Sequence, residues 1–179
     1  MATQLAFLRA INLGGRRTFG KDRIIAATES IGFDGVATYI NTGNVRFDTR
    51  MRSRARIERA LEAAYLEHAG FEVPTIVFTA AEVAAIRDEA DRLDHDRRHY
   101  VSLLKEEPSA QAVAALQAAV ADAGITDERL HVSGRAVHLL LGENYHQSRL
   151  DNAFLERHLG VATNRNLTVI REVAARWCG

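Results

Sequence analysis

The fold of the first half of this chain is decided by residues 36–47, which run Val36-Ala37-Thr38-Tyr39-Ile40-Asn41-Thr42-Gly43-Asn44-Val45-Arg46-Phe47. Residues 36–40 and 45–47 are apolar or β-branched at most positions, which predicts two short strands. The four polar residues between them, 41–44, are typical of a hairpin-type turn. We therefore expect an antiparallel pair here rather than two strands joined by a helix.

One strand and one helix are predicted on each side of this hairpin. Residues 4–9 carry apolar side chains on both faces, which predicts a strand buried on two sides. Helical spacing of apolar residues covers 21–31, and a second helix begins at a Ser53 cap and ends at Gly70. A fourth strand is expected at 75–78. The resulting order, βαββαβ, is the ferredoxin-like arrangement.

The same order begins again after a predicted helix at 80–91 and a charged connector at 92–99. The second series consists of strands at 100–104, 129–132 and 137–141, helices at 109–123 and from a Ser148 cap to Gly160, and a final helix from Leu167. Three short glycine-containing segments, at helix ends and in the hairpins, recur in the second half at a nearly constant distance along the sequence. The pairs are Gly32-Phe33 with Gly124-Ile125, Thr42-Gly43 with Ser133-Gly134, and His68-Ala69-Gly70 with His158-Leu159-Gly160.

An internal duplication explains this constant spacing. The predicted fold class is therefore α+β, a tandem duplication of a ferredoxin-like βαββαβ unit whose two halves pack together. Residues 1–80 would form the first half and residues 81–99 a helix and charged connector. Residues 100–179 would form the second half with a C-terminal helix.

Composition limits the classes of protein to which the chain can belong. An apolar fraction of 47% and a charged fraction of 26% are ordinary for a globular domain, and the formal net charge of zero argues against nonspecific coating of nucleic acid. The sequence has no apolar run near the ~18 residues of a membrane helix and no secretory leader at its start. A single cysteine, Cys178, can form neither an internal disulfide nor a thiolate metal site. We expect a soluble cytoplasmic protein, monomeric or homodimeric, without cofactor, metal, membrane or nucleic-acid partner.

Three segments resemble motifs of the DUF1697 family. Residues 7–15, Phe7-Leu8-Arg9-Ala10-Ile11-Asn12-Leu13-Gly14-Gly15, resemble its amino-terminal LRGIN(V)GG motif, residues 39–45 its YI(Q/N)SGNVVF segment, and residues 160–166 its LGV…TxRN element. The resemblance implies a two-part ferredoxin-like architecture and no activity, because the function of the family is unknown. Ala10 stands where glycine is common. Ser148-Arg149 stands where a Ser-Lys pair is often seen, so Schiff-base chemistry by a lysine is not expected there.

The loop that follows the first predicted strand is the first candidate binding site. Its glycines allow backbone N–H groups to turn toward a ligand, the following helix start carries a positive dipole, and its basic side chains supply charge. It matches neither the Walker A pattern nor GxGxxG. A tight turn with solvated arginines is the alternative. The residues are Arg9, Asn12, Gly14, Gly15, Arg16 and Arg17, together with Lys21.

Two polar segments, predicted as turns, form the second candidate site. Their amides and hydroxyls suit turns through local hydrogen bonds, but with Arg9 they could also line a cleft between the halves. An arginine at the end of an apolar strand needs a partner, either a structural carboxylate or a ligand. The residues are Asn41, Thr42 and Asn44 in the first segment, and Asn164, Arg165 and Asn166, after Thr163, in the second.

Two further charged clusters are interpreted as solvated surface. The run Arg50, Arg52, Arg54, Arg56 and Arg59 has no interleaved aromatic side chain to stack on bases. His95 and His99 have the i, i+4 spacing of a helical zinc site, but the surrounding 91–99 segment is strongly charged and contains no HExxH motif. No catalytic residue is identified.

The favoured function is a binding module for a small anionic ligand, phosphorylated or carboxylated, in a cleft lined by these Arg, Asn and Gly motifs. Two alternatives remain open. One is an enzyme that uses the same cleft to stabilise charge in a transition state. The other is an interaction module that pairs through a sheet edge.

Overall fold

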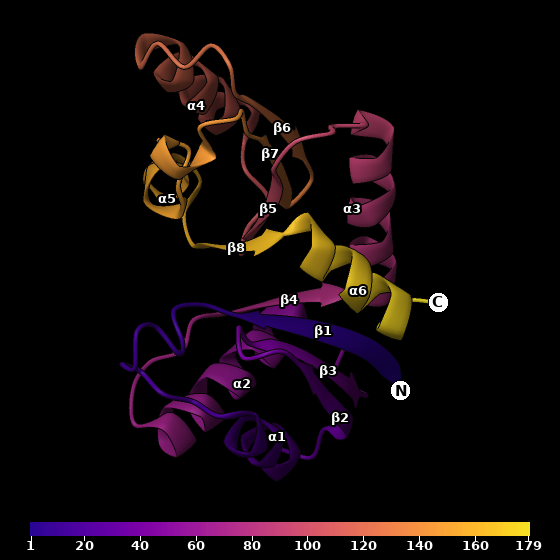
Figure 1. Cartoon of the computed structure of the whole chain (residues 1–179). Coiled ribbons are helices and arrows are strands. Elements are labelled where there is room, and N and C mark those ends of the chain that lie inside the picture. Colours follow the sequence, from indigo (N-terminus) through magenta and orange to yellow (C-terminus); the bar gives the residue numbers. More distant parts are fainter. The chain divides into compact units, whose positions relative to one another are not determined.

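A computed structural model describes all 179 residues, Met1–Gly179, and confirms an α+β fold built from two similar halves (Figure 1). The chain divides into two compact units, one formed by residues 1–83 and 173–179, the other by residues 84–172. None of the helices combines the length and the apolar character needed to cross a bilayer.

The first unit contains a four-stranded antiparallel sheet in the order β2-β3-β1-β4, which is the ferredoxin-like order. The predicted hairpin is its β2-β3 pair, with a bulge between Asp34 and Ala37. The elements are β1 (Ala2–Leu8), α1 (Lys21–Ser30), β2 (Asp34–Tyr39), β3 (Asn44–Thr49), α2 (Arg54–Ala69) and β4 (Thr75–Thr79), followed by α3 (Ala80–Leu93).

The second unit repeats this topology, with the strand order β6-β7-β5-β8. The same position in each sheet is thus taken by the same element of the repeat, as a duplication predicts. The elements are β5 (His99–Leu104), α4 (Ala110–Asp122), β6 (Arg129–Ser133), β7 (Ala136–Leu140), a 3-10 turn η1 (Tyr145–Gln147), α5 (Asn152–Leu159), β8 (Ala162–Asn166) and α6 (Leu167–Trp177).

Two local predictions in the second half were wrong. Residues 163–166 form most of strand β8 rather than a polar turn, because pairing with β5 overrides their polar character. Helix α5 is capped by Asp151, whose carboxylate accepts the N–H of Phe154 at 2.7 Å, and not by Ser148. The Ser148 hydroxyl instead donates to the Glu128 carboxylate at 2.7 Å.

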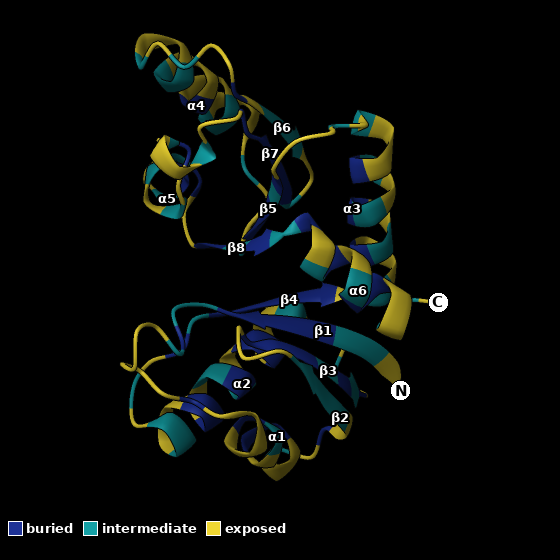
Figure 2. Ribbon diagram, viewed as in Figure 1, coloured by how far each residue is buried: buried dark blue, intermediate teal, exposed yellow.

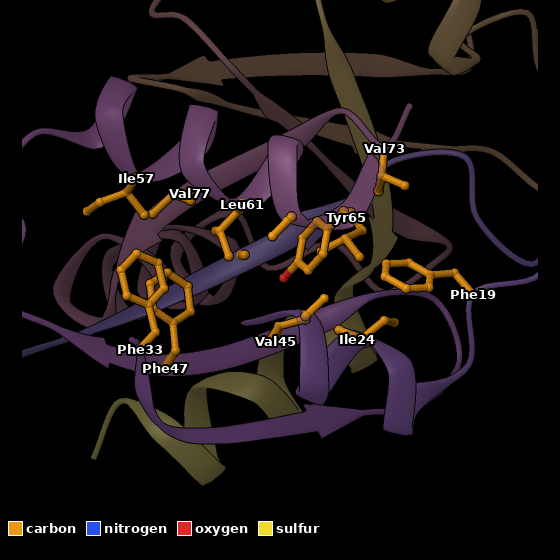
Figure 3. Close-up of a cluster of buried hydrophobic side chains, with 14 of the residues drawn as sticks. Phe19, Ile24, Phe33, Val45, Phe47, Ile57, Leu61, Tyr65, Val73 and Val77 are labelled. Carbon is orange, nitrogen blue, oxygen red and sulfur yellow. The ribbon is translucent and has the colours of Figure 1, made fainter. Parts of the chain in front are cut away.

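Helices α1 and α2 pack on one face of the first sheet and close the core drawn in Figure 3. Phe33 and Phe47 stack with ring centroids 4.9 Å apart, and the Tyr65 hydroxyl lies 2.9 Å from the Thr28 hydroxyl. Burial raises the pKa of the Tyr65 phenol well above its ordinary value. Fully burying each such side chain contributes about 1.5–3 kcal/mol.

Strand β1 is buried on both faces, as its apolar alternation predicted. Ala6 and Leu8 point into the helix-covered core, whereas Leu5 and Phe7 alternate with them and are equally inaccessible. On that second face Phe7 meets Phe78 of β4 edge to face at 6.0 Å. In Figure 2 the later part of β1 and most of β4 are coloured as buried, whereas β2 is not.

In both repeats, glutamates of the second helix bind the outer strand. In the first unit, Glu62 and Glu58 of α2 accept the N–H groups of Thr75 and Val77 at 2.9 and 3.0 Å. In the second, Glu156 of α5 accepts the N–H of Ala162 at 3.0 Å. These carboxylates satisfy donors that an edge strand would otherwise present to another chain.

The core of the second unit lies between its sheet and helices α4 and α5. Val137 and Leu139 of β7 and Leu104 of β5 face these helices. Leu116 of α4 and Leu155 of α5 meet them from the helix side, and both are fully buried. The opposite face of this sheet carries a different set of residues, including three histidines.

We predict that Gly43→Ala destabilises the first unit by about 2–4 kcal/mol. Gly43 has φ of +78°, and an added Cβ would lie 2.6 Å from the Leu8 Cβ and 3.0 Å from the Ile11 Cδ1. Gly32→Ala is the matched control, because Gly32 has the same φ but open space around it, and it should cost only about 1 kcal/mol. Urea denaturation of both variants measures the difference, and equal losses would contradict the steric explanation.

Candidate functional site

The loop between β1 and α1 is held by the side chain of Asn12. The Asn12 amide donates to the carbonyls of Phe19 and Asn41 at 3.1 and 2.8 Å, and its oxygen accepts the N–H of Phe19 at 2.8 Å. Phe19 is fully buried, so this closure is anchored in the core. Asn12 therefore joins its own loop to the 41–44 turn, and the two predicted candidate segments of the first unit lie together.

Arg17 is the second side chain that fixes the loop. Its Nε donates to the carbonyl of Ala10 at 2.7 Å, and its terminal nitrogen donates to the carbonyl of Glu72. The guanidinium also lies over the Phe71 ring, 4.6 Å from the centroid. These contacts give Arg17 a structural role and leave its charge at the loop surface.

The backbone of this loop adopts an unusual series of conformations. Positive φ angles occur at Ala10, Asn12, Gly14, Gly15 and Arg17. Left-handed conformations are costly for non-glycine residues and are maintained only where the surroundings impose them.

Gly14 and Gly15 occupy the centre of a tight turn at the tip of the loop. The turn is closed by a hydrogen bond from the N–H of Arg16 to the carbonyl of Leu13 at 2.8 Å. Both central glycines have positive φ, at +53° and +78°, and both are exposed. Their N–H groups lie outside the hydrogen-bonded ring and donate to no acceptor in the protein. The sequence predicted either a tight turn or a loop with free backbone N–H donors. The turn at Gly14 and Gly15 is both, because it is tight and leaves these two N–H groups free.

The 41–44 turn uses its polar side chains internally. The amide of buried Asn44 donates to the carbonyl of Tyr39 at 2.9 Å and to the Thr42 hydroxyl at 3.0 Å. The carbonyl of Gly43 accepts the N–H of Leu8, which ties the turn to the end of β1. Asn41 and Thr42 are exposed, so they remain accessible beside the loop.

The remaining predicted residues lie on β8 of the second unit. Arg165 is buried, and its Nη1 donates to the Thr163 hydroxyl and the Asn164 carbonyl, both at 2.9 Å. Burial lowers the pKa of Arg165 to about 10, so it stays protonated at neutral pH. Asn166 caps α6 by accepting the N–H of Thr168 at 2.9 Å, and the side-chain oxygen of Asn164 is buried without a partner.

A chain of histidines on the second sheet was missed by the sequence analysis. His99 of β5 and His138 of β7 are buried and joined by a hydrogen bond of 2.9 Å between Nε2 and Nδ1. His95 meets His99 edge to face at 6.2 Å, and the ring of His131 lies 6.0 Å from that of His138. His131 is in turn bound to Glu89 of α3 at 2.8 Å. Alternation in β5 and β7 places this set on the face opposite α4 and α5.

The zinc spacing predicted for His95 and His99 does not occur on a helix. Helix α3 ends at Leu93, and His99 begins β5 and is buried, so the interpretation of 92–99 as a solvated connector was wrong for this residue. No group of three His, Cys, Asp or Glu side chains is arranged to hold a metal ion.

Burial keeps the central histidine pair neutral. Desolvation, reinforced by electrostatic repulsion from His138, His95 and Arg171, lowers the pKa of His99 to about 4. Desolvation, reinforced by His131 and partly offset by Glu89, lowers the pKa of His138 to about 4. The outer nitrogens, Nδ1 of His99 and Nε2 of His138, have no hydrogen-bond partner. An added proton would thus be placed in a site that provides no carboxylate directly to either ring.

We predict that acid destabilises the protein through this pair. The unfolded imidazoles take up protons below about pH 6.5, whereas the folded ones do so only near pH 4. The unfolded state therefore binds more protons between these values, and the free energy of unfolding falls as pH falls, by up to roughly 1.4 kcal/mol per pH unit and imidazole. The full stability is present above about pH 7.

Urea denaturation between pH 7 and pH 4.5 tests this prediction. The double variant His99→Phe, His138→Phe should show a shallower fall in unfolding free energy over that range. His146→Gln, which removes an exposed histidine of the same unit, should keep the wild-type slope. A double variant with an unchanged slope would show that other groups cause the acid sensitivity.

Comparison with known proteins places the chain within a family. The family model described as "Protein of unknown function (DUF1697)" matches residues 1–138. The solved structure of the conserved bacterial protein SP0830 from Streptococcus pneumoniae is similar to it with a TM-score of 0.73 and 22% sequence identity, over 98% of each chain. At that identity the likeness concerns the fold alone. No protein with a curated description matches the sequence.

Proposed function

The chain belongs to the DUF1697 family, as residues 7–15 predicted, and from that premise we propose that it binds a small anionic ligand, phosphorylated or carboxylated, at the loop between β1 and α1. The observation that carries the proposal is that the N–H groups of Gly14 and Gly15 donate to no acceptor in the protein. They lie in a loop that the hydrogen bonds of the Asn12 side chain hold in place. Asn41 and Thr42 would form the adjoining wall.

Preorganisation supports this function. Asn12 and Arg17 make six contacts between them that fix the loop before any ligand arrives. A ligand would then avoid most of the entropic cost of ordering a flexible loop. Left-handed backbone at Ala10, Asn12 and Arg17 is a strained state that a simple connection would not need.

The charge of the segment supports an anion rather than a cation. Four basic residues lie between the end of β1 and the first turn of α1, and no Asp or Glu precedes Asp22 in the sequence. The four are Arg9, Arg16, Arg17 and Lys21. Arg16 is exposed at the turn beside the glycine N–H groups, where its guanidinium could contact an oxyanion bound there. Gly20, which caps α1, contributes no side-chain acceptor to the helix start.

We predict that inorganic phosphate, sugar phosphates or citrate raises the melting temperature of the wild type and not that of Arg16→Glu. A ligand at about 100 times its dissociation constant stabilises the native state by about 2.7 kcal/mol, which for a chain of this size is roughly 5–11 °C. Arg16 makes no side-chain contact within the protein that its replacement would remove, so the variant should fold. Thermal unfolding against each anion measures both effects.

Arg52→Glu is the matched control, because Arg52 is an exposed arginine of the same unit outside the loop. It changes the net charge identically and should retain the wild-type response. The absence of a shift with every anion, or an equal loss in both variants, would contradict binding at the loop. The phosphate and citrate arms distinguish a phosphorylated from a carboxylated ligand.

A further inference from the structure

Each repeat has a surface pocket at the same place in its topology. In the first unit, a pocket of about 340 Å³ lies where α1 leads into β2 and where β3 ends, and its lining includes Phe33, Asp34 and Arg50. In the second, a pocket of about 240 Å³ lies where α4 leads into β6 and beyond the end of β7. A duplicated pocket allows the two linings to be compared position by position.

The buried residue just before the strand differs between the two pockets. Phe33 immediately precedes β2, is 4% exposed and stacks on Phe47 in the core. Glu128 immediately precedes β6 and is 8% exposed. In the register that aligns Gly32-Phe33 with Gly124-Ile125, Phe33 corresponds to Ile125, and Glu128 is a buried carboxylate that the second pocket has in addition. A buried carboxylate destabilises the fold unless its oxygens are satisfied.

Only one oxygen of Glu128 is satisfied within the protein. Its Oε2 accepts the Ser148 hydroxyl at 2.7 Å, and the Ser148 oxygen in turn accepts the N–H of Leu150 at 3.1 Å. No protein group donates to Oε1, and Glu128 lines the pocket. Oε1 of this largely buried carboxylate can therefore accept a hydrogen bond from a ligand in the pocket.

An extended connection in the second repeat forms the other wall. Residues 50–53 join β3 to α2, whereas residues 141–151, which include the η1 turn, join β7 to α5. This longer segment supplies Asn144, Gln147, Ser148 and Arg149 to the pocket. Gly142 within it leaves room for the Asp127 carboxylate, since a Cβ there would lie 2.7 Å from the Asp127 Oδ2. The segment thus supplies the partner of Glu128 and the space for a second acid.

We propose that this pocket of the second unit is a binding site for a small primary amine, whose ammonium N–H groups donate to Glu128 and Asp127. The lining has two carboxylates and one guanidinium, which gives it a formal charge of −1, and the guanidinium of Arg149 donates to the Ala123 carbonyl. An ammonium group carries a positive charge that balances the negative charge of the lining. Its N–H groups can also donate to Oε1 of Glu128, which has no donor within the protein. The exposed amides of Asn144 and Gln147 would bind a polar group on the same ligand.

Titration with ethanolamine, followed by amide NMR shifts, tests the site. We expect saturable shifts confined to residues 124–128 and 144–149, with a dissociation constant in the millimolar range. Choline carries the same charge but has no N–H donor, so it should bind at least about tenfold more weakly. Saturable binding of choline equal to that of ethanolamine would overturn the assignment to a hydrogen-bonded amine.

Glu128→Gln is the informative variant, because it keeps the shape and an acceptor for Ser148 while removing the charge. Ethanolamine binding should weaken at least about tenfold. Asp34→Asn, which removes a carboxylate from the lining of the first-unit pocket, should leave it unchanged. No saturable shift in the wild type, equal affinity in Glu128→Gln, or binding of glucose in preference to ethanolamine would each overturn the proposal. Phosphate binding at the first-unit loop does not depend on any of these outcomes.

Discussion

In both repeats, a backbone N–H of an outer strand donates a hydrogen bond to a carboxylate of the second helix, and this bond ties the helix to the edge of its sheet. Glu62 binds Thr75 and Glu58 binds Val77 in the first unit, and Glu156 binds Ala162 in the second. The N–H groups of Thr75 and Val77 in β4 and of Ala162 in β8 are thereby occupied. These positions are no longer free to pair with an added strand.

The repeats share this framework but differ in the polar groups that they bury. The first unit buries Glu58 and Asn44 beside an aromatic and aliphatic core, and its exposed β1–α1 loop has several positive φ angles. The second buries a histidine pair on one face of its sheet and a carboxylate at the end of it. Since the duplicated framework supplies stability to both copies, each copy can tolerate a different local departure from an apolar interior.

Secondary structure was predictable where the pattern of apolar residues was strong. The hairpin at Tyr39–Phe47, the Ser53 cap and the left-handed Gly70 stop all occur as the sequence indicated. Strand β8 was missed because its alternation is between polar residues, and only pairing with β5 identifies it as a strand. The Asp151 cap was missed because Ser148 is an equally good cap in isolation, and its hydroxyl is instead bound to a carboxylate 20 positions away.

The sequence by itself determined the duplication, the α+β class and the composition of the β1–α1 loop, because these depend on local spacing and on residue type. Only the tertiary structure decided which polar side chains remain accessible. In the sequence, four side chains were equivalent candidates for ligand contacts: Asn12, Arg16, Arg17 and Asn44. In the fold, the side chains of Asn12, Arg17 and Asn44 donate to backbone carbonyls, whereas no backbone carbonyl accepts a hydrogen bond from the side chain of Arg16. The pairing of His99 with His138 and of Glu128 with Ser148 joins residues distant in sequence, and such contacts arise from strand register and chain reversal rather than from any local pattern.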